Sequence, residues 1–407
     1  MIDTTSPQFW RATLALCLAS FIIFANLHGM QPLLPMMAED FARTELQISH
    51  AYTVATFSLG ISLLLFGPLS DALGRRGILI LTLIGVCITT MAIGFVTEYS
   101  ALFWMRVLQG FFLAGVPAVA IAYMGDEYTR PALLTAVGLY IASNSLGGVT
   151  GRLIAGWVGD WLGWSDLFMF LGLGSLIGLM LVFWLLPKSE HFIASPFRPK
   201  RMCLDLCQHV SNPILLLAYL IGGLNFLIFL NQYSYITFVL ASEPFNLSST
   251  WIGLLFLTYL TGTVGSLLSG KLSRRWSSPA CMALGIVIML CGSLFTLHPT
   301  LTSIVMGFFI ASFGFFLTHS VASGWVSQQA THARGSASAL YLVFYYVGAS
   351  VGGWYLNPFW MSAGWKGVVL GSVVIFAITF ACAMILAYWQ FNRHHTKASD
   401  KLTSHCS

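Results

Sequence analysis

Long apolar runs recur along the whole chain, and short polar segments separate them. Each run holds about the 20 apolar residues that a helix needs to cross a lipid bilayer. The runs are continuous rather than alternating, which favours helices over a β-barrel because a helix satisfies its own backbone hydrogen bonds in lipid. The pattern predicts twelve transmembrane helices, at roughly 11–36, 47–70, 78–97, 100–124, 134–158, 165–186, 213–240, 249–270, 279–297, 301–325, 335–358 and 365–390.

One long polar segment, 187–212, interrupts this pattern in the middle of the chain and contains three prolines and several basic residues. We expect it to be a cytoplasmic linker between an N-terminal six-helix bundle, 1–186, and a C-terminal six-helix bundle, 213–392. Residues 393–407 would form a cytoplasmic tail. The expected fold class is an all-α membrane protein with two pseudo-symmetric bundles.

Short matches between the two halves support this pseudo-symmetry. They keep their order, and their offset drifts only from 204 to 201 residues. A duplicated unit of this kind is typical of transporters whose substrate path runs between the halves. The matches pair Glu39–Phe41 with Glu243–Phe245, Gly67–Ser70 with Gly270–Ser273, and Leu139, Tyr140 and Gly147 with Leu340, Tyr341 and Gly348.

The composition excludes a soluble protein, because only 8% of the residues are charged where a soluble domain has about 25%. The net charge is +5, but the basic residues lie in small groups between apolar runs, so we exclude nucleic-acid binding. With the N-terminus inside, only Arg43 and Lys366 fall in external loops. This positive-inside bias predicts an inner-membrane protein with both termini cytoplasmic. The fifteen cytoplasmic residues are Arg11, Arg75, Arg76, Arg130, Lys188, Arg198, Lys200, Arg201, Lys271, Arg274, Arg275, Arg334, Arg393, Lys397 and Lys401.

The sequence gives little reason to expect a metal, a cofactor or an enzyme. Cys203, Cys207 and His209 have the spacing of metal ligands, but a fourth ligand is not evident. The zinc-binding pattern H-E-x-x-H is absent, and no carboxylate pair lies inside a run. We interpret the first apolar run as a retained helix rather than a signal peptide.

The segment between the second and third predicted helices reads Gly-Pro-Leu-Ser-Asp-Ala-Leu-Gly-Arg-Arg over 67–76. Its glycines permit a tight turn, and its arginines can hold acids at the inner end of the run 100–124. The alternative is that both arginines are only topology signals. We expect a breakable inner gate made of Gly67, Asp71, Gly74, Arg75, Arg76, Asp126 and Glu127.

This loop resembles the signature loop of the major facilitator superfamily, although Ala72 replaces the usual basic residue. The sequence Arg106-Val-Leu-Gln109-Gly110 resembles a second motif of that family, whose arginine is implicated in proton coupling. A charge inside a membrane span costs about 2.5–3.5 kcal/mol on insertion scales, which favours a functional role. The alternative is that Arg106 reaches the external interface.

A third motif lies in the run 134–158, where glycines follow the spacing of the family's antiporter motif. Arg152 and Ala155 stand where the motif has proline and glycine. The resemblance implies close helix packing and favours export. Together with segments 318–323 and 338–341, this run resembles the YnfM-type, efflux-like branch of the family. The packing glycines are Gly138, Gly147, Gly151 and Gly156.

No Asp or Glu lies in the middle of any run, and the intramembrane ionisable residues are Arg106, Arg152, His28 and His319. A lipophilic cation would meet like charge there, so we expect an anionic, zwitterionic or neutral amphipathic substrate. Only histidine ordinarily titrates near neutral pH, which makes His28 and His319 candidate proton carriers. Each could instead be a hydrogen-bonded residue of a helix contact.

Polar and aromatic side chains in the runs expected to face the pathway are candidates for the substrate cavity. For any one aromatic residue the alternative is ordinary packing. The candidates are Asn26, Gln31, Tyr123, Asn144, Arg152, Asn225, Asn231, Gln232, Tyr233, Trp325, Tyr341 and Tyr345.

These features predict a monomeric secondary transporter that works by alternating access in the lipid bilayer. The favoured function is proton-coupled export of a small molecule, and the alternative is proton-linked import. A membrane enzyme is disfavoured because H-E-x-x-H and carboxylate pairs within the runs are lacking, and a sensor is disfavoured because the sequence shows no soluble signalling domain.

Overall fold

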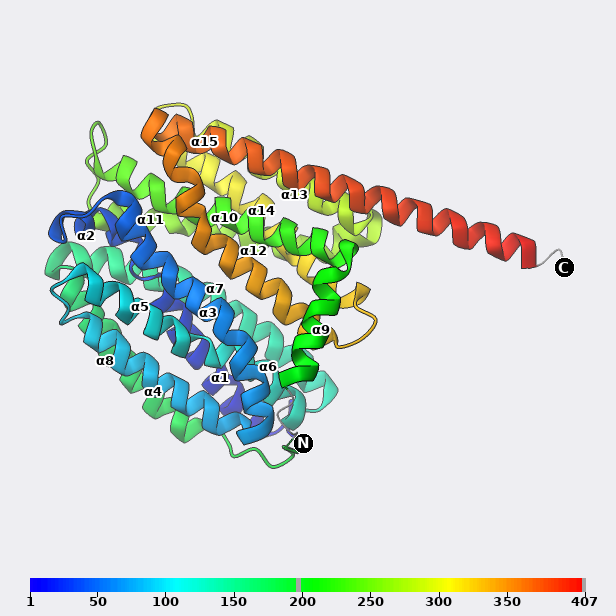
Figure 1. Cartoon of the computed structure of the whole chain (residues 1–407). Helices are drawn as coiled ribbons and strands as arrows, with labels where there is room; N and C mark the ends of the chain where they lie inside the picture. Colours follow the sequence, from blue (N-terminus) through cyan, green and yellow to red (C-terminus); the bar gives the residue numbers. More distant parts are fainter. Residues whose placement is uncertain (195–198, 405–407) are drawn as a thin grey trace. The chain divides into compact units, whose positions relative to one another are not determined.

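The computed structural model describes residues 1–194 and 199–404, with side chains for 1–194 and 200–392. Arg198 of the predicted linker, and the side chains of the predicted tail, lie outside these described residues. Within them, regular structure is helical apart from one bridge between Ile2 and Tyr128. Figure 1 shows helices α1 (Pro7–His28), η1 (Gln31–Leu33), α2 (Leu34–Asp40), α3 (Glu45–Leu73), α4 (Arg75–Ile93), α5 (Tyr99–Leu113), α6 (Gly115–Glu127), α7 (Arg130–Leu162), α8 (Trp164–Leu185), α9 (Pro199–Ser211), α10 (Pro213–Ala241), α11 (Ser249–Leu254), η2 (Leu255–Thr258), α12 (Tyr259–Arg275), α13 (Ser278–Phe295), α14 (Leu301–Gln329) and α15 (Arg334–Ser404).

Eleven helical segments among the described residues are long and apolar enough to cross a membrane. The last of them, Arg334–Asn392, is two helices that meet at Ala363 and Gly364, where the backbone leaves the helical conformation. Figure 1 shows the chain turning back at this point of α15. Twelve crossings result, so the prediction of an all-α membrane fold is confirmed.

Local sequence explains why α3 begins and ends where it does. The backbone N–H of Gln47 donates to the Thr44 hydroxyl at 3.3 Å, and the Gln47 side chain accepts from the Thr44 N–H at 3.2 Å, which forms a capping box. At the other end Gly74 has a φ of 106°, a conformation that side chains with a Cβ rarely adopt. Gly74 is therefore a one-residue turn between α3 and α4.

The described chain forms two compact units. Unit 1 comprises Met1–Lys200, Asn231–Leu257 and Ala349–Asn357, and unit 2 comprises Arg201–Leu230, Thr258–Gly348 and Pro358–Ser407. Unit 1 thus adds to the first six crossings one end of α10, all of α11 and a short part of α15. The bundles at 1–186 and 213–392, joined by the linker 187–212, remain a proposal.

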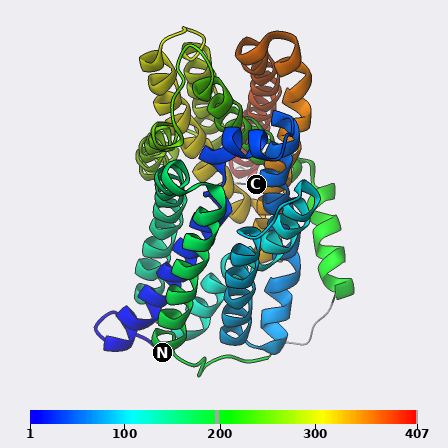
Figure 2. The same ribbon diagram turned by 90° about the vertical axis from the view of Figure 1, so that its left-hand side faces the viewer.

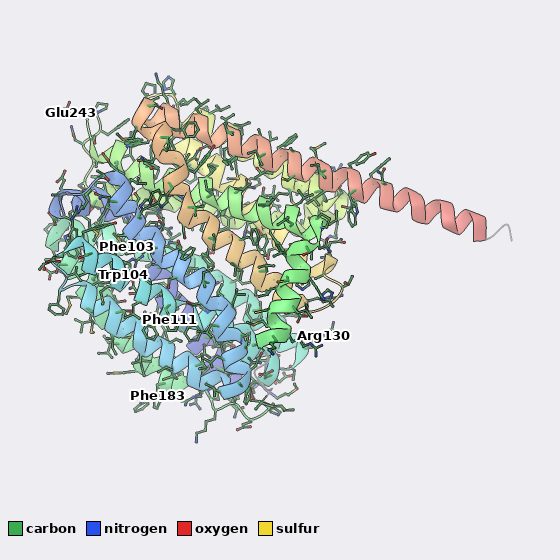
Figure 3. All side chains as sticks on the ribbon, in the orientation of Figure 1. Phe103, Trp104, Phe111, Arg130, Phe183 and Glu243 are labelled. Atoms are coloured by element: carbon green, nitrogen blue, oxygen red, sulfur yellow. The ribbon has the colours of Figure 1, made fainter. Side chains whose placement is uncertain are left out.

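The outer faces of the helices are apolar. Trp104 on α5 and Phe183 on α8, both labelled in Figure 3, are 65% and 52% exposed. Large exposed apolar side chains recur on most spans. In water such a surface would be an aggregation site, whereas in a bilayer it is the surface that lipid covers.

Glycines of α7 allow it to lie directly on α1, which Figure 2 shows in dark blue beside later helices of unit 1. A Cβ at Gly151 would lie 2.5 Å from the Ala25 Cα, and one at Gly147 would lie 2.5 Å from the Phe21 carbonyl oxygen. Close approach of this kind is how membrane helices gain packing energy. Among the other motif glycines, Gly156 meets the backbone of α11, and Gly138 faces open space.

We expect Gly151→Ala to destabilise the protein by about 1–3 kcal/mol, because the new methyl group overlaps the α1 backbone. Gly138→Ala, in the same motif on the same helix, should be neutral or stabilising, because alanine favours the helix more than glycine does. Thermal unfolding in detergent measures both. Equal changes in Tm for the two variants would contradict the proposed α1–α7 contact.

Candidate functional site

The first membrane crossing of unit 1 is broken near one end. Helix α1 ends at His28, a 3-10 turn follows at Gln31–Leu33, and α2 begins at Leu34. Pro32 has no N–H with which to continue a helix, and the last four carbonyls of a helix lack intrahelical donors. The break therefore leaves backbone oxygens that need partners inside the protein.

Arg106 on α5 supplies donors to these oxygens. Its fully buried guanidinium donates to the carbonyls of Leu27 at 3.1 Å and Asn26 at 3.5 Å. It also donates to the carbonyls of Tyr52 at 3.3 Å and Ala51 at 3.4 Å on α3. A cation at the C-terminal end of α1 is favoured by the helix dipole. Arg106 thus joins α1, α3 and α5 through neutral oxygens.

Side-chain hydrogen bonds extend this network to α4 and α8. Arg106 donates to Gln109, whose Nε2 donates to the Thr90 hydroxyl at 2.7 Å. The Thr90 hydroxyl donates to Asn26 Oδ1 at 2.8 Å, and Asn26 Nδ2 donates to the Ser175 hydroxyl at 2.8 Å. The side chain of Asn26, expected to line a cavity, therefore lies among the helices of unit 1.

A second buried cluster surrounds Arg152 on α7, which is 1% exposed. Arg152 Nε donates to Gln31 Oε1 at 2.9 Å, and the Tyr52 hydroxyl donates to the same oxygen at 3.1 Å. His28 Nδ1 lies 2.9 Å from the Tyr52 hydroxyl. A hydrogen-bonded chain therefore links His28, Tyr52, Gln31 and Arg152, and we call these four residues the Arg152 cluster.

Segments from beyond residue 212 complete this part of unit 1. The Arg152 guanidinium carbon lies over the Phe256 ring, 4.7 Å from its centroid, and Phe256 stacks on Tyr233 at 5.2 Å. Gln31 Nε2 donates to the Ser234 hydroxyl at 3.1 Å. Helices α10 and η2 therefore contact the Arg152 cluster directly.

Helix α15 contacts α3 within the same unit. The Ser350 hydroxyl donates to the Thr53 carbonyl at 3.0 Å and lies 3.0 Å from the Thr56 hydroxyl. The His50 ring stacks on Trp354 at 4.4 Å. Together with the contacts of α10 and η2, these interactions tie segments of the second half to α1, α3 and α7.

In unit 2, aromatic rings surround His319 on α14. His319 Nδ1 lies 3.0 Å from the Tyr341 hydroxyl, and its ring centroid lies 4.6 Å from that of Tyr345. Tyr345 stacks on Phe226 at 3.7 Å. His319 is thus a hydrogen-bonded member of an aromatic cluster, with Tyr341 and Tyr345 beside it as two of the expected cavity residues.

The other cavity candidates beyond the linker are buried in separate places. In unit 2, Asn225 Oδ1 accepts from Thr379 at 3.0 Å, and Trp325 is 3% exposed. In unit 1, Asn231 Nδ2 donates to the Ala349 carbonyl at 2.8 Å, and Gln232 is 3% exposed.

Two candidates from the first half make local contacts. The Ser20 hydroxyl donates to Asn144 between α1 and α7. The Tyr123 hydroxyl, near the end of α6, donates to the Pro187 carbonyl at 3.0 Å. Tyr123 therefore holds the start of the predicted linker, which its position in an apolar run did not indicate.

The loop between α3 and α4 forms an ion-pair group. Arg75 pairs with Asp71, and its Nε donates to Asp126 Oδ2 at 2.9 Å. Arg76 instead donates to two backbone carbonyls at the end of α8, at 2.9 and 3.0 Å. Gly67 has open space around its Cα. The gating role of this group remains a proposal.

Glu127 is buried, with 3% exposed, and its Oε2 lies 3.0 Å from His191 Nδ1 of the predicted linker. Its Oε1 accepts from the His191 backbone N–H at 3.0 Å. Phe192 then lies 5.8 Å from the Arg75 guanidinium. The start of the linker therefore rests on residues of the expected inner gate.

Sequence reasoning did not select several residues that the structure places in these clusters, namely Tyr52, Thr90, His191, Ser234 and Phe256. Tyr52 and Thr90 occupy apolar runs where no motif marks them. The only available signal was that a buried hydroxyl in lipid needs a partner.

Among the described residues, no group of three His, Cys, Asp or Glu side chains could hold a metal ion. Cys203 and Cys207 are exposed, and His209 stacks on His332 at 4.8 Å.

Comparison of the chain with known proteins identifies its family. The family model of the Major Facilitator Superfamily matches residues 16–353. The chain belongs to the major facilitator superfamily. It is therefore a multi-pass membrane transporter rather than an enzyme, as the loop and glycine motifs suggested.

Relatives within the superfamily are similar over most of their length. The inner membrane transport protein YnfM of Escherichia coli (strain K12) is 37% identical over 367 residues, which cover 90% of this chain and 88% of YnfM. The uncharacterized MFS-type transporter YybF of Bacillus subtilis (strain 168) is 34% identical over 364 residues, covering 89% and 90%. The predicted likeness to the YnfM branch is thus confirmed.

A solved structure shows the same fold. It is a bacterial homolog of the human lysosomal transporter Spinster in an inward-facing, unoccupied conformation, with a TM-score of 0.74 and 17% identity. The match covers 94% of this chain and 98% of that chain. At this identity the likeness concerns the fold alone.

We expect Arg106→Lys to lower stability by about 1–3 kcal/mol, because an ammonium cannot reach all the carbonyls that the guanidinium joins, and a buried unsatisfied carbonyl costs about that much. The matched control is Arg43→Lys, at an exposed arginine of the same unit, which should change stability by less than about 0.5 kcal/mol. Thermal unfolding in detergent compares them. A Tm for Arg106→Lys within error of the wild type would show that the carbonyl contacts do not hold the helices.

Proposed function

We propose that the protein exports a small anionic, zwitterionic or neutral amphipathic organic molecule in exchange for protons, by alternating access. It would act as a monomer in the inner membrane with both termini in the cytoplasm. The fifteen basic residues assigned to inner segments support this orientation. The similarity to YnfM, an inner membrane transport protein, supports the location.

The observation that carries the substrate class is the balance of buried charge. Among the described residues, the buried charged side chains on the spans are Arg106, Arg152 and Glu127. Glu127 lies at the end of its span and pairs with His191. The protein interior around Arg152 is therefore positive, which favours a carboxylate and disfavours a fixed cation.

Arg152 has the geometry of a switch as well as of a binding group. Its guanidinium contacts Gln31 and Phe256, and Gln31 contacts Ser234. A substrate carboxylate would form an ion pair with the guanidinium, which is stronger than the hydrogen bond to Gln31 because both partners, and not the donor alone, carry charge. Substrate binding would thereby loosen the contact of α7 and η1 with α10 and η2. The two access states would then differ in substrate affinity, as alternating access requires.

His28 and His319 are the proposed proton carriers. His28 is hydrogen-bonded to Tyr52 within the Arg152 cluster, so its protonation state can influence Arg152 through a continuous chain of contacts. His319 would act within unit 2. Arg106 would position these helices without itself carrying the proton, because a guanidinium stays protonated in proteins.

One observation favours the second candidate, proton-linked import. A proton on His28 would add positive charge near Arg152 and strengthen the binding of an anion. Proton and anion would then bind together and cross the membrane in the same direction. The glycine spacing of α7 favours export instead. The two functions therefore differ in whether an inward proton gradient drives the substrate out of the cell or into it.

Inside-out vesicles from cells that overproduce the protein distinguish these functions. Candidate substrates are first selected by thermal shift against carboxylates, sugars and dyes. We expect a labelled carboxylate to accumulate in the vesicles when their lumen is acidified, and to leave them on collapse of the gradient. Accumulation only with an alkaline lumen would support import, and the absence of any gradient effect would contradict proton coupling.

We expect Arg152→Gln to reduce uptake of an anionic substrate by at least about tenfold, since a hydrogen bond to a charged group contributes about 1.5–3 kcal/mol. Arg43→Gln, at an exposed arginine of the same unit, should transport normally. Ethidium, a fixed cation, is the substrate that we expect the protein not to transport. Ethidium transport that depends on Arg152 would refute the proposed substrate class.

A further inference from the structure

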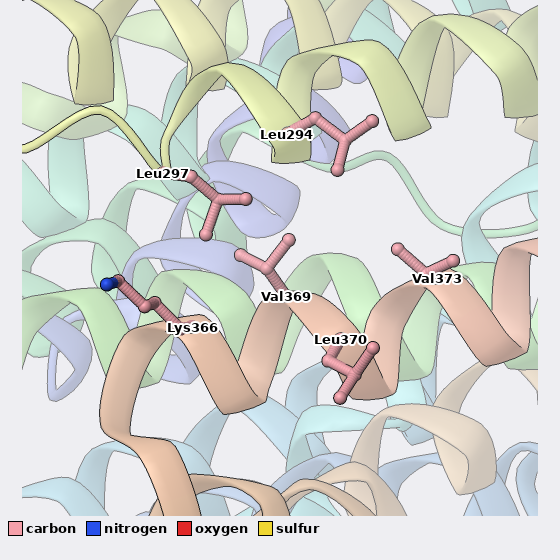
Figure 4. A pocket seen from close by; sticks show the side chains of 6 residues that line it. All are labelled: Leu294, Leu297, Lys366, Val369, Leu370 and Val373. Atoms are coloured by element: carbon pink, nitrogen blue, oxygen red, sulfur yellow. The ribbon is translucent and has the colours of Figure 1, made fainter.

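An apolar groove of about 330 Å³ opens on the surface of unit 2. Its walls come from the end of α13, from the turn that follows it, and from the part of α15 after the break at Ala363 and Gly364. Figure 4 shows Lys366 at one end of the groove and Val373 toward the other. The lining residues are Leu294, Leu297, Lys366, Val369, Leu370 and Val373.

In the proposed topology the groove lies at the outer end of the last span, where the helix leaves the membrane. Lys366 and Val373 are seven residues apart on α15, so the groove extends about 10 Å along the helix. At the Lys366 end, Trp365 Nε1 donates to the Thr296 hydroxyl at 3.0 Å, and tryptophan is enriched at membrane interfaces. Leu370 is 60% exposed, so this wall faces lipid rather than protein.

Lys366 is an unusual charge for this place. It is one of two basic residues that the proposed topology puts outside, against the positive-inside rule. From 258 to 348 the chain contains no Asp or Glu, and the acids assigned to unit 2 are Asp205 and Asp400. Asp205 lies on the linker helix α9 and Asp400 in the predicted tail, so neither belongs to the outer ends of the spans.

We propose that this groove binds one anionic phospholipid, with the phosphate at Lys366 and an acyl chain along Leu297, Leu370 and Val373. A phospholipid has its charged phosphate at the membrane interface and its acyl chains along the membrane normal. The groove matches this arrangement, because Lys366 lies at one end and apolar side chains line the rest. The lysine stem can lie on the apolar surface while its ammonium reaches the headgroup. A basic residue near a membrane surface attracts an anionic lipid with about a fivefold preference.

Native mass spectrometry of the delipidated full-length protein in detergent tests the site, with phosphatidylglycerol and phosphatidylcholine as the probes. We expect a first phosphatidylglycerol to bind the wild type about fivefold more tightly than a first phosphatidylcholine. Lys366→Ala should remove this preference. Lys271→Ala, at an exposed lysine of the same unit, is the matched control and should keep it.

A second variant tests the groove itself. Val373→Phe retains Lys366 but fills the apolar end, and should weaken the binding of both lipids several-fold with no change in Tm beyond that of the control. Undiminished phosphatidylglycerol preference in Lys366→Ala, or an equal loss in Lys271→Ala, would overturn the proposal. Because the readout is lipid binding rather than transport, the result does not depend on the proposed function.

Discussion

The packing of unit 1 depends on the buried guanidinium of Arg106, which donates hydrogen bonds to carbonyl oxygens at the end of α1. Pro32 and the short turn after His28 interrupt the first crossing, and carbonyls of Asn26 and Leu27 are left without helical partners. Arg106 reaches these oxygens from α5 and thereby fixes α1 against α3. A charge that is costly in lipid is stabilised because the backbone supplies the partial negative charge of a helix terminus.

The break in the first crossing also places the residues of the Arg152 cluster, to which we assign a role in transport. It brings His28 and Gln31 to the same level of unit 1 as Tyr52 and Arg152, so that one hydrogen-bonded chain joins four elements. The glycines of α7 allow Arg152 to approach this chain, because α7 lies directly on the backbone of α1. Close helix packing and the buried charge are therefore consequences of the same local geometry.

Charge is distributed unevenly over the chain, and this distribution organises both proposals. The interior around Arg152 is positive, and an anionic substrate would complete it. The second cation, Lys366, lies on the surface of unit 2 rather than in the protein interior. No Asp or Glu of the spans in that unit is available to pair with it. In each case the proposed ligand is an anion, because it would offset the cost of a cation in an unfavourable environment.

The hydrophobic pattern by itself determined the twelve crossings and the all-α fold, because a span must satisfy its own backbone in lipid. The motif at 67–76 suggested the family through its resemblance to the family's signature loop. The hydrophobic pattern also identified Arg106 and Arg152 as charges inside apolar runs. Only the tertiary structure decided what they touch: carbonyl oxygens from a broken helix for Arg106, and Gln31 and Phe256 for Arg152. It likewise placed Asn26 among helices and Tyr123 on the linker. A sequence records which side chains are polar, but the partner of each polar atom depends on which helices face each other, and long-range packing sets that choice.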